Sequence, residues 1–218
     1  MRAMNTTKNI TATLNELEFL MATVHPPAFM ALGDGLALHE IERKVHAYSH
    51  VLEKAGVTFP FELVELYHWH DGSNKEDIIG IVQLLSLDEA LKTWGMLIDA
   101  AGNQFPSKDW YNPKWIPFAT SWADTYLCID LHGSGGGTPG QIIQFDRNSP
   151  TRTIDAFSMK EWLEEVVDDY ELEEPTRTHG IAAGDEGEDE LYDYDPEEAP
   201  DGPSCYIGTF DAGDSKFS

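Results

Sequence analysis

Apolar residues recur at intervals of three and four in five stretches of the sequence, a spacing that predicts amphipathic helices. The predicted helices cover residues 11–25, 36–56, 60–70, 86–102 and 159–173. Pro26 and Pro27 end the first helix, and Gly56 ends the second. Three helices begin with a capping-box spacing, formed by Thr13 and Glu16, by Ser86 and Glu89, and by Ser158 and Glu161.

Stretches rich in β-branched and aromatic residues lie between the helices and predict strands. They cover residues 78–85, 114–120, 124–131, 141–147 and 151–157. The last four follow one another with short links, and such strands pair antiparallel. The sequence therefore predicts an α+β fold, with N-terminal helices packed on a mostly antiparallel sheet, a C-terminal helix and an acidic tail.

One inter-strand link is dense in glycine. Gly135, Gly137 and Gly140 have the G-x-G-x-x-G spacing of dinucleotide-binding loops. Such a site needs a helix directly after the loop, because the helix N-terminus supplies the amides that meet the phosphate. Here the strand-like segment 141–147 follows. We therefore expect a hairpin connection rather than a phosphate site.

Charge narrows the function classes. The chain of 218 residues has a formal net charge of −25, and residues 159–218 hold 20 of its 39 acidic residues but 3 of its 14 basic ones. This balance argues against nucleic-acid and anionic-membrane binding and favours a basic partner. Only two cysteines occur, and no apolar run approaches the length of a spanning helix, so we expect a cytoplasmic protein with reduced thiols.

Candidate chemistry is weak throughout the sequence. His39, His46 and His50 share one side of a predicted helix, but the H-E-x-x-H pattern is incomplete, which favours a solvated flank over a metal site. His68 and His70 close the third helix, where imidazoles commonly meet the last carbonyls. The acidic pairs at 164–165 and 168–169 repel each other, as on a solvated helix face. We expect no catalytic residues, metal or cofactor.

Periodicity fails after Pro175. Ten acidic residues lie from Asp185 to Asp201 without a Lys or Arg between them, which is typical of a disordered, solvating segment. Tyr192 and Tyr194 within this run, and the strand-like composition of residues 205–211, leave two alternatives open. The tail packs back on the sheet edge, or it presents acids and aromatics to a basic protein.

Six ordered motifs together resemble the SUKH superfamily, in its Smi/Knr branch, over about residues 36–172. They are LYHWHDGS, LLSLDEAL, NPKWIPFA, YLCIDL, GGGTPGQIIQFDR and FSMKEWLEEVVDDYE. The resemblance implies a domain over residues 36–174, flanked by an N-terminal helix and linker at 1–35 and an acidic extension at 175–218. It also implies a family scaffold, carried by Trp69, Gly72, Trp115, Pro117, Asp130, Gly136, Gly137, Pro139, Gly140 and Trp162.

The resemblance implies binding of another protein, not catalysis. Bacterial members resemble immunity proteins that neutralise polymorphic toxins, and a fungal branch coordinates cell-wall synthesis. The first hypothesis is an immunity protein that binds a cognate toxin with a basic surface; the alternative is a regulatory adaptor of the host's own pathways. We expect the partner to contact Trp122, Asp124, Glu164, Asp168, Glu171, Asp189, Tyr192 and Tyr194. The oligomeric state is left open.

Overall fold

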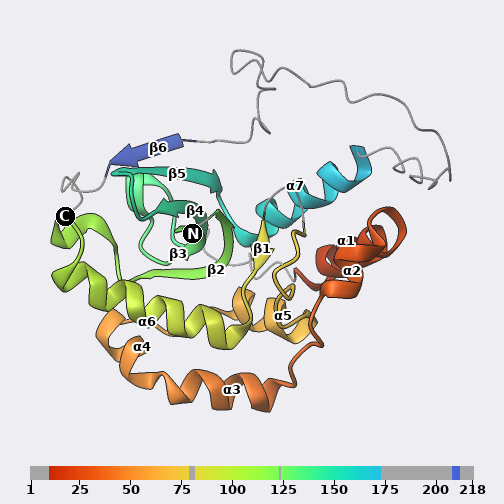
Figure 1. Cartoon of the computed structure of the whole chain (residues 1–218), viewed down its shortest axis with the longest axis horizontal. Coiled ribbons are helices and arrows are strands. Elements are labelled where there is room, and N and C mark those ends of the chain that lie inside the picture. Colours follow the sequence, from red (N-terminus) through yellow and green to blue (C-terminus); the bar gives the residue numbers. More distant parts are fainter. Residues whose placement is uncertain (1–9, 79–81, 123, 173–207, 212–218) are drawn as a thin grey trace, which may run out of the picture.

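A computed structural model describes residues 10–78, 82–122, 124–172 and 208–211 of the chain (Figure 1). The helices are α1 (Thr11–Val24), α2 (Pro26–Ala31), α3 (Leu38–Ala47), α4 (Ser49–Ala55), α5 (Phe61–Trp69), α6 (Leu87–Asn103) and α7 (Met159–Leu172). The strands are β1 (Gln83–Leu84), β2 (Trp115–Trp122), β3 (Thr125–Asp130), β4 (Gln141–Asp146), β5 (Thr151–Ala156) and β6 (Gly208–Asp211). The predicted α+β class is confirmed.

The strands form one antiparallel sheet in chain order, from β1 to β6. This order confirms the expectation that successive strands pair with their neighbours. β6 lies at the outer edge, where Phe210 pairs with Arg152 of β5. Part of the tail therefore packs back on the sheet edge, as one of the alternatives held.

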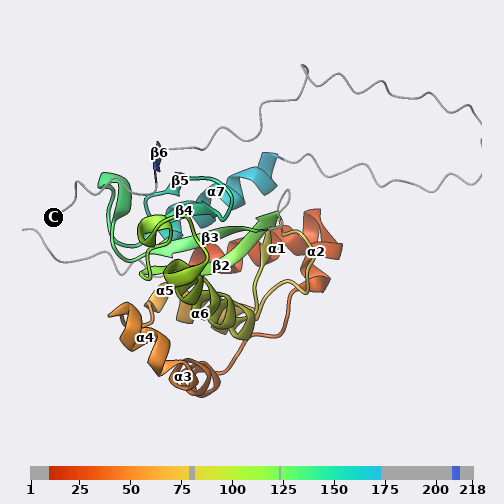
Figure 2. The same cartoon turned by 60° about the vertical axis from the view of Figure 1, so that its left-hand side comes forward.

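The helices cover the sheet in layers. Figures 1 and 2 both show α3 and α4 outermost, with α6 between them and the sheet. β3 and β4 are buried along most of their length, because both faces of the sheet are covered. The Trp162 ring of α7 meets Phe118 of β2 edge to face, with 5.2 Å between centroids. α1 contributes Leu14, Leu17 and Met21 to the same hydrophobic core.

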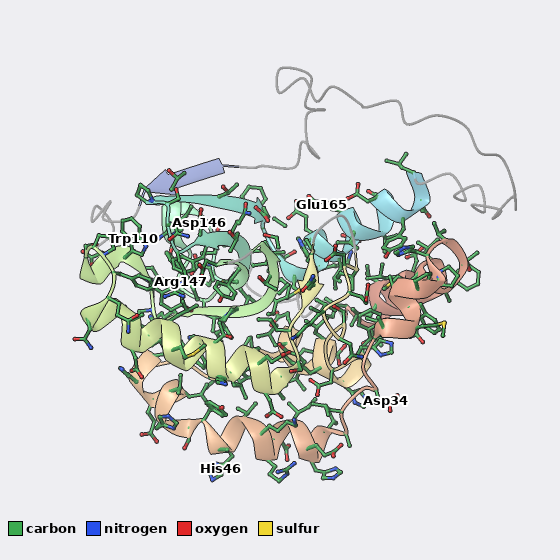
Figure 3. The ribbon with its side chains drawn as sticks, in the orientation of Figure 1. Asp34, His46, Trp110, Asp146, Arg147 and Glu165 are labelled. Carbon is green, nitrogen blue, oxygen red and sulfur yellow. The ribbon has the colours of Figure 1, made fainter. Side chains whose placement is uncertain are left out.

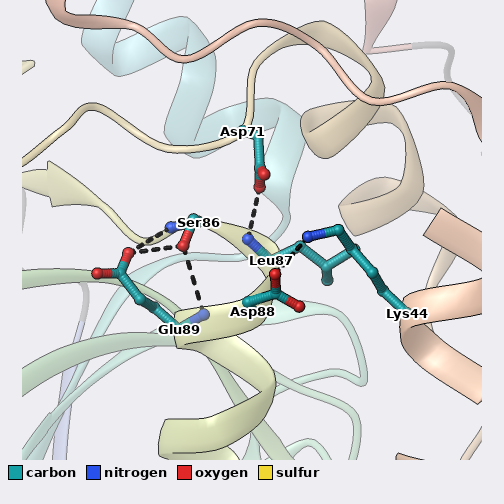
Figure 4. A network of polar contacts seen from close by, with 6 residues as sticks. All are labelled: Lys44, Asp71, Ser86, Leu87, Asp88 and Glu89. Atoms are coloured by element: carbon teal, nitrogen blue, oxygen red, sulfur yellow. Dashed lines mark hydrogen bonds and ion pairs between the residues drawn. The ribbon is translucent and has the colours of Figure 1, made fainter. Parts of the chain in front are cut away.

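Two helix ends follow the sequence prediction closely. Ser86 caps α6: its Oγ accepts from the Glu89 N–H, and the Glu89 carboxylate accepts from the Ser86 N–H at 3.0 Å (Figure 4). Asp71 adds a second cap, because its carboxylate accepts from the Leu87 N–H at 2.6 Å. Gly56 ends α4 in the left-handed conformation, with φ of 67°. The Ser86 cap and the Gly56 helix end depend on neighbours in the chain, whereas the Asp71 cap comes from a residue 16 positions before Leu87.

Two other predictions about the helices are wrong. The helix expected over residues 36–56 breaks at Tyr48 into α3 and α4. The bend lets both pieces follow α6, since Lys44 of α3 pairs with Asp88 and Lys54 of α4 pairs with Asp99. The cap expected at Thr13 is also absent: α1 begins at Thr11, and Thr13 is buried inside it.

Candidate protein-interaction surfaces

The glycine-rich loop between β3 and β4 folds around a buried carboxylate. Asp130, the last residue of β3, is fully buried. Its carboxylate accepts from the backbone N–H groups of His132 at 2.7 Å, Gly133 at 3.2 Å and Ser134 at 2.6 Å. The side-chain amide of Gln141 donates to it at 2.9 Å. The loop amides therefore point inward, toward a negative charge that belongs to the chain.

This arrangement explains the glycine spacing without a phosphate. A phosphate would need the same amides and would be repelled by Asp130. Position 137 needs a glycine, because a Cβ there would overlap the side chain of Gln141, at 2.7 Å from its Cδ. Gly140 has a φ of 97° and leads directly into β4. The predicted hairpin connection is confirmed.

The residues implied as family scaffold lie mainly in the core and this loop. Trp115 and Trp162 are almost fully buried, as is Pro117 in β2. The Trp115 indole donates to Ser134 Oγ at 3.0 Å, and the Trp69 indole of α5 donates to Glu18 of α1 at 3.0 Å. Gly72 has a φ of 85° and is buried, while Gly136 and Pro139 are exposed in the loop.

The histidines serve separate structural environments. His39 and His46 are exposed on α3, and His50 stacks on Tyr48 with 6.1 Å between ring centroids. Nδ1 of His68 lies 2.8 Å from the Leu36 carbonyl, and Nδ1 of His70 lies 2.6 Å from that of Gly33. The two imidazoles thus bind the segment before α3 rather than the last carbonyls of α5. Within the described residues, no group of three or more His, Cys, Asp or Glu could hold a metal ion.

The outward face of α7 is acidic. Glu164, Asp168 and Glu171 are exposed and, being three and four residues apart, share one side of the helix. Lys160, the only basic residue of α7, pairs with Glu164. Partial burial raises the pKa of Glu165, and repulsion from Glu161, Asp169 and Asp168 raises it further. The helix therefore presents negative charge that its own sequence does not neutralise.

An acidic residue of β5, Asp155, lies close enough to the acids of α7 to interact with Glu165. Asp155 lies at an irregularity of β5, where Ile154 pairs with Ile143 while Ala156 pairs with Ile142. Burial, and then repulsion from Glu165, raise the pKa of Asp155 to about 7. Its Oδ1 is buried and has no hydrogen-bond partner among the described residues. We call Asp155, Glu165 and Asp168 the acidic seam between β5 and α7.

The other predicted contact lies elsewhere. Asp124 occupies the β2–β3 turn with a φ of 72°, and its carboxylate pairs with Arg147 at 3.1 Å. The Arg147 guanidinium also lies 5.7 Å from the centroid of Phe105. Figure 3 shows Arg147 well apart from Glu165, so the structure does not bring Asp124 together with the face of α7. The charge of Asp124 is moreover paired, which makes it a weaker attractor of a basic partner.

The remaining predicted contacts are not placed. Trp122 ends β2, and its side chain lies outside the described residues. Asp189, Tyr192 and Tyr194 also lie outside them. Asp155 was not among the expected contact residues. Its half-buried position between Ile154 and Ala156 follows from the irregularity of β5, which no sequence pattern marks. The sequence also does not predict a shallow hollow of about 720 Å³, which is lined by Leu52, Val57, Pro60, Lys114 and Leu131, among others.

Comparison with known proteins gives one match. The family description SMI1 / KNR4 family (SUKH-1) matches residues 49–165, which is more than half of the chain. No curated protein matches the sequence. Within the described ranges, no helix is long and apolar enough to cross a membrane. The matched region runs from α4 into α7, and it includes the Asp130 loop and both Asp155 and Glu165.

Proposed function

The chain belongs to the SMI1 / KNR4 family (SUKH-1), and we propose that it is an immunity protein that neutralises a cognate toxin by stoichiometric binding. The family supports a protein-interaction role in general. The finer assignment, a toxin with a basic surface, draws its support from the acidic face of α7 and the acidic seam. On this proposal the chain transforms no substrate: it covers the working surface of another protein.

The observation that carries the proposal is the crowding of acids along α7 and β5. Six of the fourteen residues of α7 are acidic and one is basic. The raised pKa values of Asp155 and Glu165 have burial as their main cause, and repulsion between neighbouring acids adds to it. A cationic partner would relieve that repulsion and gain favourable Coulomb energy at the same surface.

Charge would determine the rate of capture, and apolar contact the lifetime of the complex. Complementary fields raise association rates by roughly 10–10³. Anchors of a tight complex are buried apolar side chains near the centre of the interface. Leu172 at the end of α7 and Phe157 just before it are 80% and 48% exposed. They flank the acidic face at either end, where a partner of standard size, burying about 800 Å² per side, would cover both.

The test is co-expression with a candidate toxin domain taken from a neighbouring gene, read as growth of the host cell. We expect the wild-type chain to restore growth and the double variant Asp168→Lys, Glu171→Lys to lose that protection. The association rate of the purified pair should fall at least tenfold in the variant and approach the wild-type value at high salt. The matched control reverses two exposed acids on α3 and α4, Glu42→Lys and Glu53→Lys.

Equal protection by both double variants would contradict the use of the α7 face. Failure of the wild-type chain to protect against that toxin would contradict the immunity role itself. If the wild-type chain then bound a protein of its own cell through the α7 face, the regulatory-adaptor alternative would replace the proposal.

A further inference from the structure

The outer edge of β5 is occupied by a strand from a distant part of the chain. β1 to β5 follow one another in the sheet and in the sequence, whereas β6 begins 36 residues after the end of α7. Its four residues pair with Thr151 to Ile154 of β5. Closing the long connection between α7 and β6 opposes the docking of β6 on this edge. β6 is therefore a weakly favoured occupant of this edge.

β5 does not depend on β6 for its own position. Arg152 is fully buried, and its guanidinium donates to the carbonyls of Trp110 at 2.7 Å and Thr151 at 2.9 Å. The same guanidinium lies 4.5 Å from the centroid of Phe145. Ala156, at the end of the strand, is also fully buried. Because β4 and these contacts hold β5, its edge is a preformed template for an incoming strand.

The described part of the β6 ladder lies directly before the acidic seam in β5. In the described residues it ends where Gly208 pairs with Ile154, and the next residue of β5 is Asp155. A residue opposite Asp155 in a longer strand would share its face of the sheet. A Lys or Arg there would meet the Asp155 carboxylate, whose Oδ1 has no hydrogen-bond partner among the described residues, and would lie on the side of Glu165. In the sequence, Gly208 is preceded by Ile207, which carries no charge.

We propose that the β5 edge is a strand-accepting site, on which an extended segment of the partner protein, with a basic side chain opposite Asp155, replaces β6. Backbone ladder bonds would supply sequence-independent affinity, and the basic residue would supply selectivity. The inference relies on the proposed function only for the basic character of the partner. It makes β6 a built-in competitor that lowers the apparent affinity for every incoming strand, so that displacement requires the additional attraction of the basic residue.

The test uses the full chain and two labelled synthetic peptides. One peptide has the sequence of residues 206–213, and the other carries Ile207→Lys at the register of Asp155. The receptor is the chain with Thr209→Pro, because proline is unfavourable within a paired strand. We expect fluorescence anisotropy to show at least tenfold tighter binding of the first peptide to Thr209→Pro than to wild type. The lysine peptide should bind Thr209→Pro about tenfold tighter still, and lose that gain when Asp155→Asn is added.

Equal affinity of both peptides for Thr209→Pro, or no binding by either, would overturn the proposal. If Thr209→Pro unfolds, wild type is titrated with the lysine peptide and followed by the backbone NMR contacts between the paired residues Arg152 and Phe210. Loss of those contacts supports replacement of β6, and their persistence at saturating peptide overturns it. A concentration-dependent dimer of wild type that binds neither peptide would assign the edge to β6 of a second copy, which also overturns it. None of these outcomes depends on the α7 charge reversals.

Discussion

Replacing Asp155 with asparagine should stabilise the protein at neutral pH and have little effect in acid. The folded chain holds the Asp155 proton more tightly than the unfolded chain, since its pKa rises from the ordinary 3.8 to about 7. Below about pH 4 Asp155 is protonated in both the folded and the unfolded chain, so it makes no pH-dependent contribution to the free energy of unfolding. Between about pH 4 and 7 the unfolded chain releases its proton first, so wild type loses stability as the pH rises. Above about pH 7 the loss is complete and constant.

The size of the effect follows from the pKa difference. A rise from 3.8 to about 7, at about 1.36 kcal/mol per pKa unit, corresponds to about 4 kcal/mol of lost stability at pH 8. The Asp155 side chain is only partly enclosed, so solvent screening reduces the expected gain from Asp155→Asn to about 2–4 kcal/mol. Glu165→Gln should recover a smaller part, because repulsion from Glu165 is the second cause of the raised pKa, after burial.

The assay is urea denaturation of wild type, Asp155→Asn and Glu165→Gln at pH 4, 6 and 8 and constant ionic strength. The difference between Asp155→Asn and wild type should grow from near zero at pH 4 to its full value at pH 8. Glu42→Gln, an exposed acid on α3, serves as the control and should run parallel to wild type. A parallel curve for Asp155→Asn would refute the reasoning, because it would show that Asp155 titrates alike in the folded and unfolded chains.

Three further predictions concern the loop and the edge strand. Asp130→Ala should cost more than about 3 kcal/mol in urea denaturation, since it leaves three loop N–H groups without their acceptor; a near-neutral result would contradict the role given to the carboxylate. Gly137→Ala should destabilise through its overlap with Gln141, whereas Gly102→Ala, in α6 with open space around it, should be neutral or stabilising by up to about 1 kcal/mol. A chain truncated after Pro175 should keep its circular dichroism spectrum yet self-associate in sedimentation, because the β5 edge loses β6; a strictly monomeric truncation would count against an adhesive edge.

Structural features that depend on residues close together in the chain were predictable from the sequence. The Ser86 cap and the Gly56 helix end depend on neighbours in the chain, and both were predictable. The order of the strands was also predictable, because short links leave antiparallel pairing as the natural outcome. These features required no knowledge of which distant residues meet.

Features that depend on distant contacts were not predictable. The break at Tyr48 follows from packing of α3 and α4 along α6, which the helical spacing of residues 36–56 does not encode. The inward turn of the loop amides required knowing that Asp130 is buried beneath them. The acidic seam joins Asp155 to α7 through the fold, and a helical pattern alone shows only the α7 half. Sequence therefore located half of the candidate surface and assigned Asp124 to it, which the structure separates.

The Asp130 loop has a consequence for how glycine-rich motifs are interpreted. The anion that the loop amides bind is the carboxylate of Asp130, which belongs to the chain itself. Folding alone therefore fills this anion site. Asp130→Ala would remove this carboxylate and leave the loop N–H groups free to bind a small carboxylate from solution, such as formate. In this protein, a glycine spacing typical of loops that bind an external anion thus belongs to a loop whose anion site is occupied by its own Asp130.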